Sequence, residues 1–321
     1  MTRTFAPNGI RSGWEAWIQE ADRRAHTDHC GRSDTRGGNM SQAIVVGVDG
    51  SDYAERAVEW AAAEAILRRH RLHLVHAVES WPYRAPLFAP PQTVDLMARI
   101  GRDVLNGAQE RARERWPDLE ITAALVSDDT AHALRGQSAD AFELVLGHRG
   151  LGGFAGLMLG TTSLRVAARS TVPVVIVRGE GGRGGDITVG IDLRKDADAI
   201  LRYAFDTAAL QGARLRILHA WRISQTLVEA GFAPDRTKVE GELFDRLVSA
   251  AGPWRAKYPQ VEVVPEIAVD HPVAALANAS HSARLLVVGT HARSWTAPRL
   301  GSAAHGTIHH AHCPVAVVPA Q

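Results

Sequence analysis

Short apolar runs alternate with longer amphipathic stretches from Ala43 onward. The first run, Ala43–Val48, is long enough for one buried strand, and Ala54–Arg69 then places its apolar residues at helical spacing. The same alternation predicts further strands at Arg71–Val78, Ile121–Val126, Phe142–Leu146 and Val172–Val177, and further helices at Thr93–Arg115, Thr130–Gln137 and Ser163–Arg169. Strands that alternate with helices predict a parallel sheet with right-handed crossovers.

The whole pattern then occurs a second time. Ile187–Asp192 repeats Ile44–Asp49, and Gly190 follows Gly47 by 143 residues. Cys313-Pro314 repeats Val172-Pro173 at a separation of 141 residues. A repeat of this length with so little drift indicates a tandem duplication.

Composition narrows the class of protein. The chain has 321 residues, 45% of them hydrophobic and 22% charged, which is typical of a soluble protein of about two domains. A formal net charge of +1 argues against a nucleic-acid-binding surface. No apolar run approaches the ~20 residues of a membrane span, and the N-terminus has no apolar secretory core. The two cysteines, Cys30 and Cys313, indicate no disulfide framework, so a cytoplasmic location is expected.

A glycine-rich loop begins at Gly147 and ends where the next helix is predicted. Glycines let a ligand approach the main chain, and successive N–H groups can then bind an anion. The hydroxyls of Thr161, Thr162 and Ser163 fall at the start of the helix, where unpaired N–H donors also lie. The loop has neither the Gly-Lys-Ser/Thr of a Walker A motif nor the position of a dinucleotide fingerprint. A surface loop that binds nothing is the alternative.

The spacing Gly147-x2-Gly150-x9-Gly160-Thr161 resembles the ATP-binding signature of the universal stress protein family. The resemblance covers two copies between Ala43 and Pro319. It implies two flavodoxin-like (adenine nucleotide alpha hydrolase-like) α/β domains, each with a mostly parallel five-stranded sheet between helices. It also implies that the two copies pair as a pseudo-dimer and that whole chains form homodimers. Pairing of the short final strands, Val172–Val177 and Val315–Val318, would cover their exposed edges.

By the same resemblance, ATP with Mg²⁺ lies across the strand ends of the first copy. Asp49 is expected near the ribose or the metal, the backbone of Val78 at the adenine edge, and the loop glycines at the phosphates. A helix N-cap role with Ser51 is the alternative for Asp49, and a solvated side chain is the alternative for Arg149. The predicted contacts are Gly47, Asp49, Val78, Gly147, His148, Arg149, Gly150, Leu151, Gly152, Gly153, Gly160, Thr161 and Thr162.

The second copy keeps only part of this motif. Ala292 replaces the second glycine, where a Cβ is unfavourable. Eight residues separate Ala292 from Gly301, whereas nine separate Gly150 from Gly160. Trp295 and Pro298 also stiffen the interior of this loop. We therefore expect tight binding at the first site and weak or no binding at the second. The second set of predicted contacts is Gly190, Asp192, Gly289, Gly301 and Ser302. Both copies also lack the Gly-x-Pro that is common in the family after the third strand; Ser127–Thr130 and Val269–Pro272 stand there.

The predicted organisation has four parts. Residues 1–41 form a flexible extension, 42–178 a first domain with the intact motif, 179–186 a Gly-rich linker, and 187–321 a second domain with the degenerate motif. Two alternatives stay open for the extension: a docking arm that uses Trp14 and Trp17, or a start of the natural protein at Met40.

No nucleophile–base spacing indicates an enzyme. Four histidines lie near Cys313: His305, His309, His310 and His312. They could supply ligands to a metal ion, but we expect them to belong to the end of a surface helix. His76 and His219 occupy equivalent strand positions, which favours packing. The sequence thus predicts an ATP-binding regulator of stress or energy state that acts on an unidentified protein partner without efficient turnover. A nucleotide-independent scaffold and a slow ATPase are the alternatives.

Overall fold

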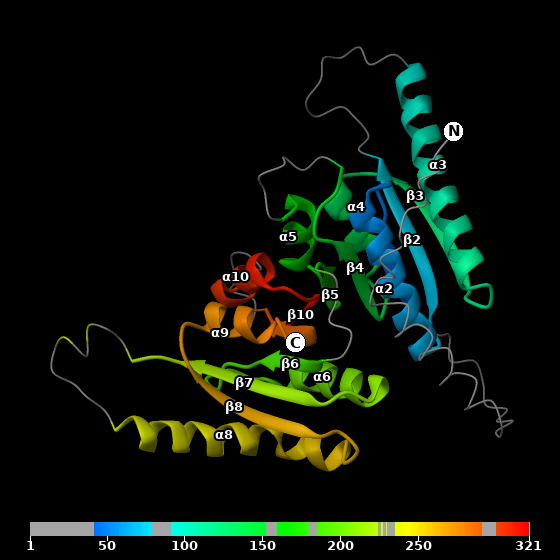
Figure 1. Ribbon diagram of the computed structural model, residues 1–321. Coiled ribbons are helices and arrows are strands. Elements are labelled where there is room, and N and C mark those ends of the chain that lie inside the picture. Colours follow the sequence, from blue (N-terminus) through cyan, green and yellow to red (C-terminus); the bar gives the residue numbers. More distant parts are fainter. Residues whose placement is uncertain are drawn as a thin grey trace, which may run out of the picture.

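A computed structural model of the chain describes residues 42–78, 91–151, 159–179, 185–223, 226, 229, 235–290 and 300–320. The strands are β1 (Ala43–Gly47), β2 (Arg71–Val78), β3 (Ile121–Ser127), β4 (Glu143–Gly147), β5 (Val174–Val177), β6 (Asp186–Gly190), β7 (Leu215–Trp221), β8 (Val263–Val269), β9 (Ala283–Gly289) and β10 (Val315–Val318). They form one continuous ten-stranded sheet in the order β3-β2-β1-β4-β5-β10-β9-β6-β7-β8 (Figure 1). Each half is a parallel five-stranded sheet, as the fold prediction required.

Helices cover both faces of this sheet. They are α2 (Asp52–Arg68), α3 (Pro91–Arg115), α4 (Thr130–Gln137), α5 (Thr161–Ala167), α6 (Asp198–Gln211), α8 (Arg236–Lys257), α9 (Pro272–Ala279) and α10 (Ser302–His310). One hydrophobic core joins α2, α3, α6 and α8 to one face, and a second core joins α4, α5, α9 and α10 to the other. Both cores contain residues of both repeats, so the two halves bury apolar surface together.

The two halves meet where β5 pairs with β10. This pairing is antiparallel, with Ala316 opposite Val175 and Val315 opposite Ile176. All four residues of each strand are buried, because neither strand is a sheet edge. The expected pairing of the final strands is therefore confirmed, and it leaves β3 and β8 as the outer strands.

Element boundaries differ from the sequence predictions by one or two residues. The helix predicted from Ser163 begins at Thr161, because Gly160 has the extended φ of −73° and ψ of 142° of an N-cap. β6 begins at Asp186, the last residue of the predicted linker. The predicted extension, residues 1–41, lies outside the described residues.

A buried polar cluster links the two repeats beside this joint. Arg68, at the end of α2, pairs with Glu64 at 2.6 Å and reaches across to Asp206 of α6, also at 2.6 Å. Gln211 of α6 donates to Glu64 at 3.0 Å. Tyr203 of α6 donates its hydroxyl to the fully buried Glu143 of β4 at 2.7 Å. These contacts supply polar partners to the buried side chains of Glu64, Arg68 and Glu143.

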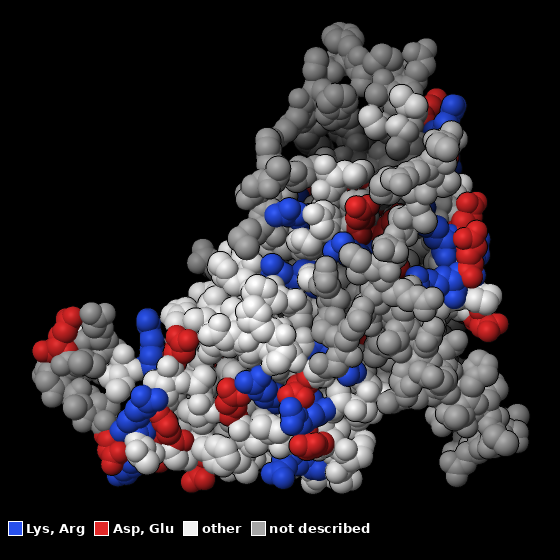
Figure 2. All heavy atoms as spheres, in the orientation of Figure 1, with Lys and Arg blue, Asp and Glu red and all other residues white. Residues whose placement is uncertain are grey.

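Charged side chains of both signs lie interspersed on the visible face, notably along α8 and α3 (Figure 2). This mixture agrees with the net charge of +1. Among the described residues, no helix is long and apolar enough to cross a membrane.

Candidate functional site

Asp49 connects three segments at the carboxyl ends of β1 and β4. The order of strands reverses between these two neighbours, and such switch points are where open α/β sheets bind ligands. One carboxylate oxygen of Asp49 accepts from the backbone N–H of Ser51 at 3.0 Å and from its hydroxyl at 2.6 Å. The other oxygen accepts from the N–H of Leu151, in the glycine loop, at 2.9 Å. Ser51, rather than Asp49, caps α2, since its hydroxyl oxygen accepts from the N–H of Ala54 at 3.2 Å.

Each glycine of the motif permits a different close contact. A Cβ on Gly150 would lie 2.3 Å from Asp49 Oδ2, so a side chain there would break the contact between Asp49 and the loop. Gly147 lets β4 approach the backbone of Tyr53, whose carbonyl oxygen would lie 2.7 Å from a Cβ. A Cβ on Gly47 would meet the Leu146 side chain at 2.6 Å. Gly47 and Gly147 therefore serve packing as well as any ligand.

The second end of the loop is less crowded. A Cβ added to Gly160 would come no closer than 3.5 Å to any described atom, and no side chain of the described residues caps the N-terminus of α5. Thr161 is exposed and Thr162 half-buried. Ser163 is used structurally, because its hydroxyl donates to the carbonyl oxygen of Gly147 at 2.9 Å. The first turn of α5 can thus offer N–H groups to an anion.

The side chains of His148 and Arg149 differ in whether they have hydrogen-bond partners. The His148 ring packs edge-on against Tyr53, with ring centroids 4.5 Å apart, and its Nδ1–H donates to the carbonyl oxygen of Val177 at 3.3 Å. Its main-chain carbonyl accepts from the Gly160 N–H at 2.8 Å and so joins the two ends of the loop. Burial lowers the pKa of His148, and Arg178 lowers it further. Arg149, by contrast, has a buried Nε without a hydrogen-bond partner among the described residues.

Val78 ends β2 at the same edge of the sheet. Its carbonyl oxygen accepts from the N–H of Asp128 at 3.2 Å, which uses one of its lone pairs. Gly152 and Gly153, two of the predicted contacts, lie outside the described residues, as do residues 79–90 that follow Val78.

Both carboxylates that follow β3 have hydrogen-bonding or ion-pair partners. Asp128 is ion-paired with His132, which lowers the pKa of that carboxyl. Asp129 caps α4 and accepts two hydrogen bonds of 3.0 Å from Arg165 of α5; these bonds lower its pKa. Asp129 therefore ties α4 to α5 instead of adding unpaired negative charge near the loop. No sequence signal identified Arg165, because its partner is 36 residues away.

The corresponding carboxylate of the second repeat has different partners. Asp192 accepts from Arg194 Nε at 2.9 Å and Nη2 at 3.0 Å, and lies 3.5 Å from Lys195 Nζ. The Arg194 hydrogen bonds lower the pKa of Asp192 to about 2. A cation from its own turn thus satisfies Asp192, whereas the partners of Asp49 within the described part of the chain are the neutral groups of Ser51 and Leu151.

The remaining predicted contacts of the second repeat are partly described. A Cβ on Gly190 would meet Leu276 at 2.6 Å and one on Gly289 would meet Ile200 at 3.0 Å, so both permit close packing. Gly301 is the N-cap residue of α10, and Ser302 is exposed. Residues 291–299, which include Ala292, lie outside the described residues.

The equivalent histidines of β2 and β7 support the strand ends. Nδ1–H of His76 donates to the carbonyl oxygen of Val48 at 2.7 Å, and that of His219 to Ile191 at 2.9 Å. Both contacts fix the turn that leads to the motif aspartate. His305 and His309 lie with ring centroids 4.7 Å apart, and the described residues contain no group of three or more potential metal ligands.

Comparisons with known proteins agree with this architecture. The sequence model of the "Universal stress protein family" matches twice, at residues 40–178 and 185–319. Universal stress protein Rv2623 of Mycobacterium tuberculosis is 31% identical over 295 residues, which cover 87% of this chain and 97% of that protein. Universal stress protein Rv2005c of the same species is 30% identical over 284 residues, covering 85% and 96%. A crystal structure of a universal stress protein from Archaeoglobus fulgidus superposes with a TM-score of 0.63 at 20% identity, over 87% of this chain and 96% of that one.

Proposed function

This chain belongs to the universal stress protein family as a tandem of two copies, and from that premise we propose that its first copy binds ATP with Mg²⁺. The proposed role is to report stress or energy state to a protein partner without efficient turnover. The observation that carries the proposal is the Asp49–Leu151 hydrogen bond across Gly150, which fixes the start of the glycine loop at the switch point of the sheet.

Three groups among the described residues support the proposal by their chemistry. Arg149 offers a buried donor without a partner among them, which suits a phosphate oxygen. The start of α5 offers main-chain N–H groups for the same ligand. The Asp49 carboxylate, already fixed by three hydrogen bonds, can still accept from a ribose hydroxyl or join the phosphates around Mg²⁺. The main chain of Val78 would contact the adenine edge.

A binding role without efficient turnover is favoured by how the nearby titratable groups are used. His148 has its Nδ1–H on a main-chain carbonyl, and His132 is paired with Asp128. These contacts give both rings a structural use at this edge, as expected of a site that binds rather than turns over its ligand. Bound nucleotide would instead favour one conformation of a surface that a partner recognises, by its higher affinity for that conformation.

Calorimetry with Mg-ATP tests the proposal. We expect one tight site per chain, because Asp192 is satisfied by Arg194. Gly150→Ala should weaken binding by more than about tenfold, since the new Cβ displaces Asp49. Gly136→Ala is the matched control, because no described atom lies within 4 Å of a Cβ at that position, and it should bind like the wild type. A wild-type protein that takes up no adenine nucleotide would end the proposal and favour the scaffold alternative.

A further inference from the structure

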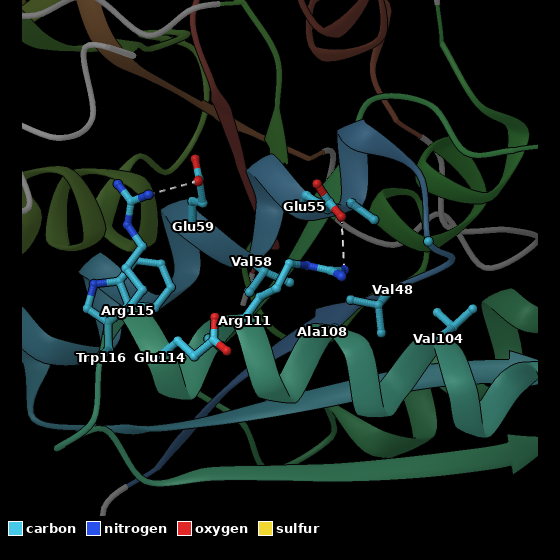
Figure 3. A pocket seen from close by; sticks show the side chains of 13 residues that line it. Val48, Glu55, Val58, Glu59, Val104, Ala108, Arg111, Glu114, Arg115 and Trp116 are labelled. Carbon is cyan, nitrogen blue, oxygen red and sulfur yellow. Dashed lines mark hydrogen bonds and ion pairs between the residues drawn. The ribbon is translucent and has the colours of Figure 1, made fainter. Parts of the chain in front are cut away.

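A groove of about 430 Å³ runs between α2 and α3 of the first repeat (Figure 3). Its apolar lining includes Val58, Val104, Ala108 and Trp116. Ion pairs join its two walls: Arg111 to Glu55 at 2.9 Å and Arg115 to Glu59 at 3.5 Å. Along α3 the lining extends from Val104 to Trp116, a distance of roughly 18 Å at the rise of an α-helix.

Two features indicate that the groove receives a peptide segment. It is long and apolar at the base with charges of both signs at its rim, which suits an amphipathic helix. In addition, Trp116 is buried while its indole Nε1 has no hydrogen-bond partner among the described residues. A buried donor of this kind normally has an acceptor.

The extension of the chain contains a sequence of matching length. Its apolar residues recur at helical spacing: Ile10, Trp14, Trp17, Ile18 and Ala21. As a helix, residues 10–21 would span roughly 17 Å, close to the length of the groove.

The extension also joins the fold at the correct end of the groove. It leads into β1, whose first residue Ala43 is paired with Arg71, and the adjacent Leu72 is paired with Ile121. The turn before Ile121 is built on Trp116, whose carbonyl accepts from Leu119 N–H at 3.2 Å. Chain entry and the Trp116 end of the groove therefore lie at the same edge of the sheet. The 20 residues between Ala21 and Gln42 can span up to roughly 66 Å, which is ample.

We propose that residues 10–21 of the same chain occupy the groove between α2 and α3, with Trp14 and Trp17 on its apolar base. The interaction does not depend on nucleotide. Its far end would meet Val48 and Gly50, which line the groove on either side of Asp49 in the sequence. The docked segment would thus support the back of the turn that holds the glycine loop.

Photo-crosslinking of the full chain tests this placement. With benzoylphenylalanine in place of Trp17, irradiation should give crosslinks to residues 54–59 or 104–116 in a species of 34.7 kDa. Crosslinks to another surface, or none, would overturn the proposal. A crosslinked species of twice that mass would also overturn it, because the segment would then dock on a second copy.

Hydrogen exchange of the full chain provides the second measurement. Amides of residues 10–21 should exchange more than about tenfold slower than an unstructured chain. Trp14→Ala/Trp17→Ala should abolish this protection, whereas Gln19→Ala/Glu20→Ala, at polar positions of the same stretch, should keep it. Val104→Asp, which places a carboxylate on the half-buried groove wall, should also abolish it while α3 stays protected. Exchange of residues 10–21 at the unstructured rate in the wild type would contradict docking.

Discussion

The two repeats have an aspartate at the same position, but the hydrogen-bond partners of the two aspartates differ. Asp49 bonds to the main chain of a distant loop, while Asp192 is held by Arg194 two residues later. The residue types that follow each aspartate explain the difference: Gly50-Ser51 offers no cation, and Leu193-Arg194 offers one. The sequence shows this change of residues, but the contact between Asp49 and Leu151, 102 residues apart, depends on the folded chain.

The asymmetry predicts unequal effects of matched substitutions. Asp49→Ala removes the acceptor of the Leu151 N–H and should lower Mg-ATP affinity by about tenfold or more, or ~1.4 kcal/mol. Asp192→Ala should leave the affinity of the tight site unchanged. Calorimetry on the two variants measures this difference, and equal losses would show that both sites bind.

The first helix of each repeat ends at a residue with left-handed backbone, but the residue type differs. Arg69 has φ of 57°, in the left-handed region, and Gly212 has the same φ in the second repeat. A Cβ is strained in that region, by roughly 1–2 kcal/mol. Arg69→Gly should therefore be about 1 kcal/mol more stable than Arg69→Ala, two variants that both lack the arginine side chain. Gly212→Ala should lose about 1 kcal/mol, and urea unfolding of the three variants checks both signs. An Arg69→Ala protein as stable as Arg69→Gly would contradict the argument.

At the scale of elements, the polar cluster between α2, β4 and α6 is the feature that sequence periodicity did not reveal. The run Phe142–Leu146 predicted a buried strand, and the strand is present as β4, yet it contains the fully buried Glu143. Its partner Tyr203 lies 60 residues away in the other repeat. Apolar spacing locates strands and helices because it reports burial, but it does not report which buried polar groups meet.

This cluster predicts a dependence of stability on pH. Burial, together with nearby Glu64, raises the pKa of Glu143 from 4.5 to about 8. The native state therefore holds the proton more tightly than the unfolded chain. The resulting stability is fully present below pH 4.5 and is lost as pH rises toward 8.

Glu143→Gln keeps an acceptor for the Tyr203 hydroxyl and removes the titration. Its free energy of unfolding should be less dependent on pH between 5 and 8 than that of the wild type. Glu120→Gln, at an exposed position, is the control and should retain the wild-type slope. The measurement is urea unfolding at several pH values, and parallel slopes for Glu143→Gln and the wild type would rule out this origin.

For the whole molecule, the sequence predicted the duplication, the fold class and the pairing of the final strands. The constant offset of 141 to 143 residues shows the duplication, the alternation of strands and helices with the family resemblance gave the fold class, and the short apolar final strands suggested their pairing. The sharing of both hydrophobic cores between the halves could not be predicted, since each copy alone already predicts a complete five-stranded unit.

Shared cores predict that the two halves unfold together. Calorimetric unfolding should show one transition, because separating the halves would expose β5 and β10 as well as the polar cluster. Ala316→Asp, at a fully buried position of β10 opposite Val175, should lower the transition temperature and broaden or split the transition. Two well-separated transitions in the wild type would show that each repeat is an independent unit.

The antiparallel joint of β5 and β10 also fixes where the duplicated sites point. Strands of the first half run opposite to those of the second, so their carboxyl ends emerge at opposite rims of the sheet. A partner seated over the first rim has no access to the second from the same side. If only the first copy binds nucleotide, as proposed, the ligand-dependent surface lies at one rim and the opposite rim keeps the same surface with or without ligand.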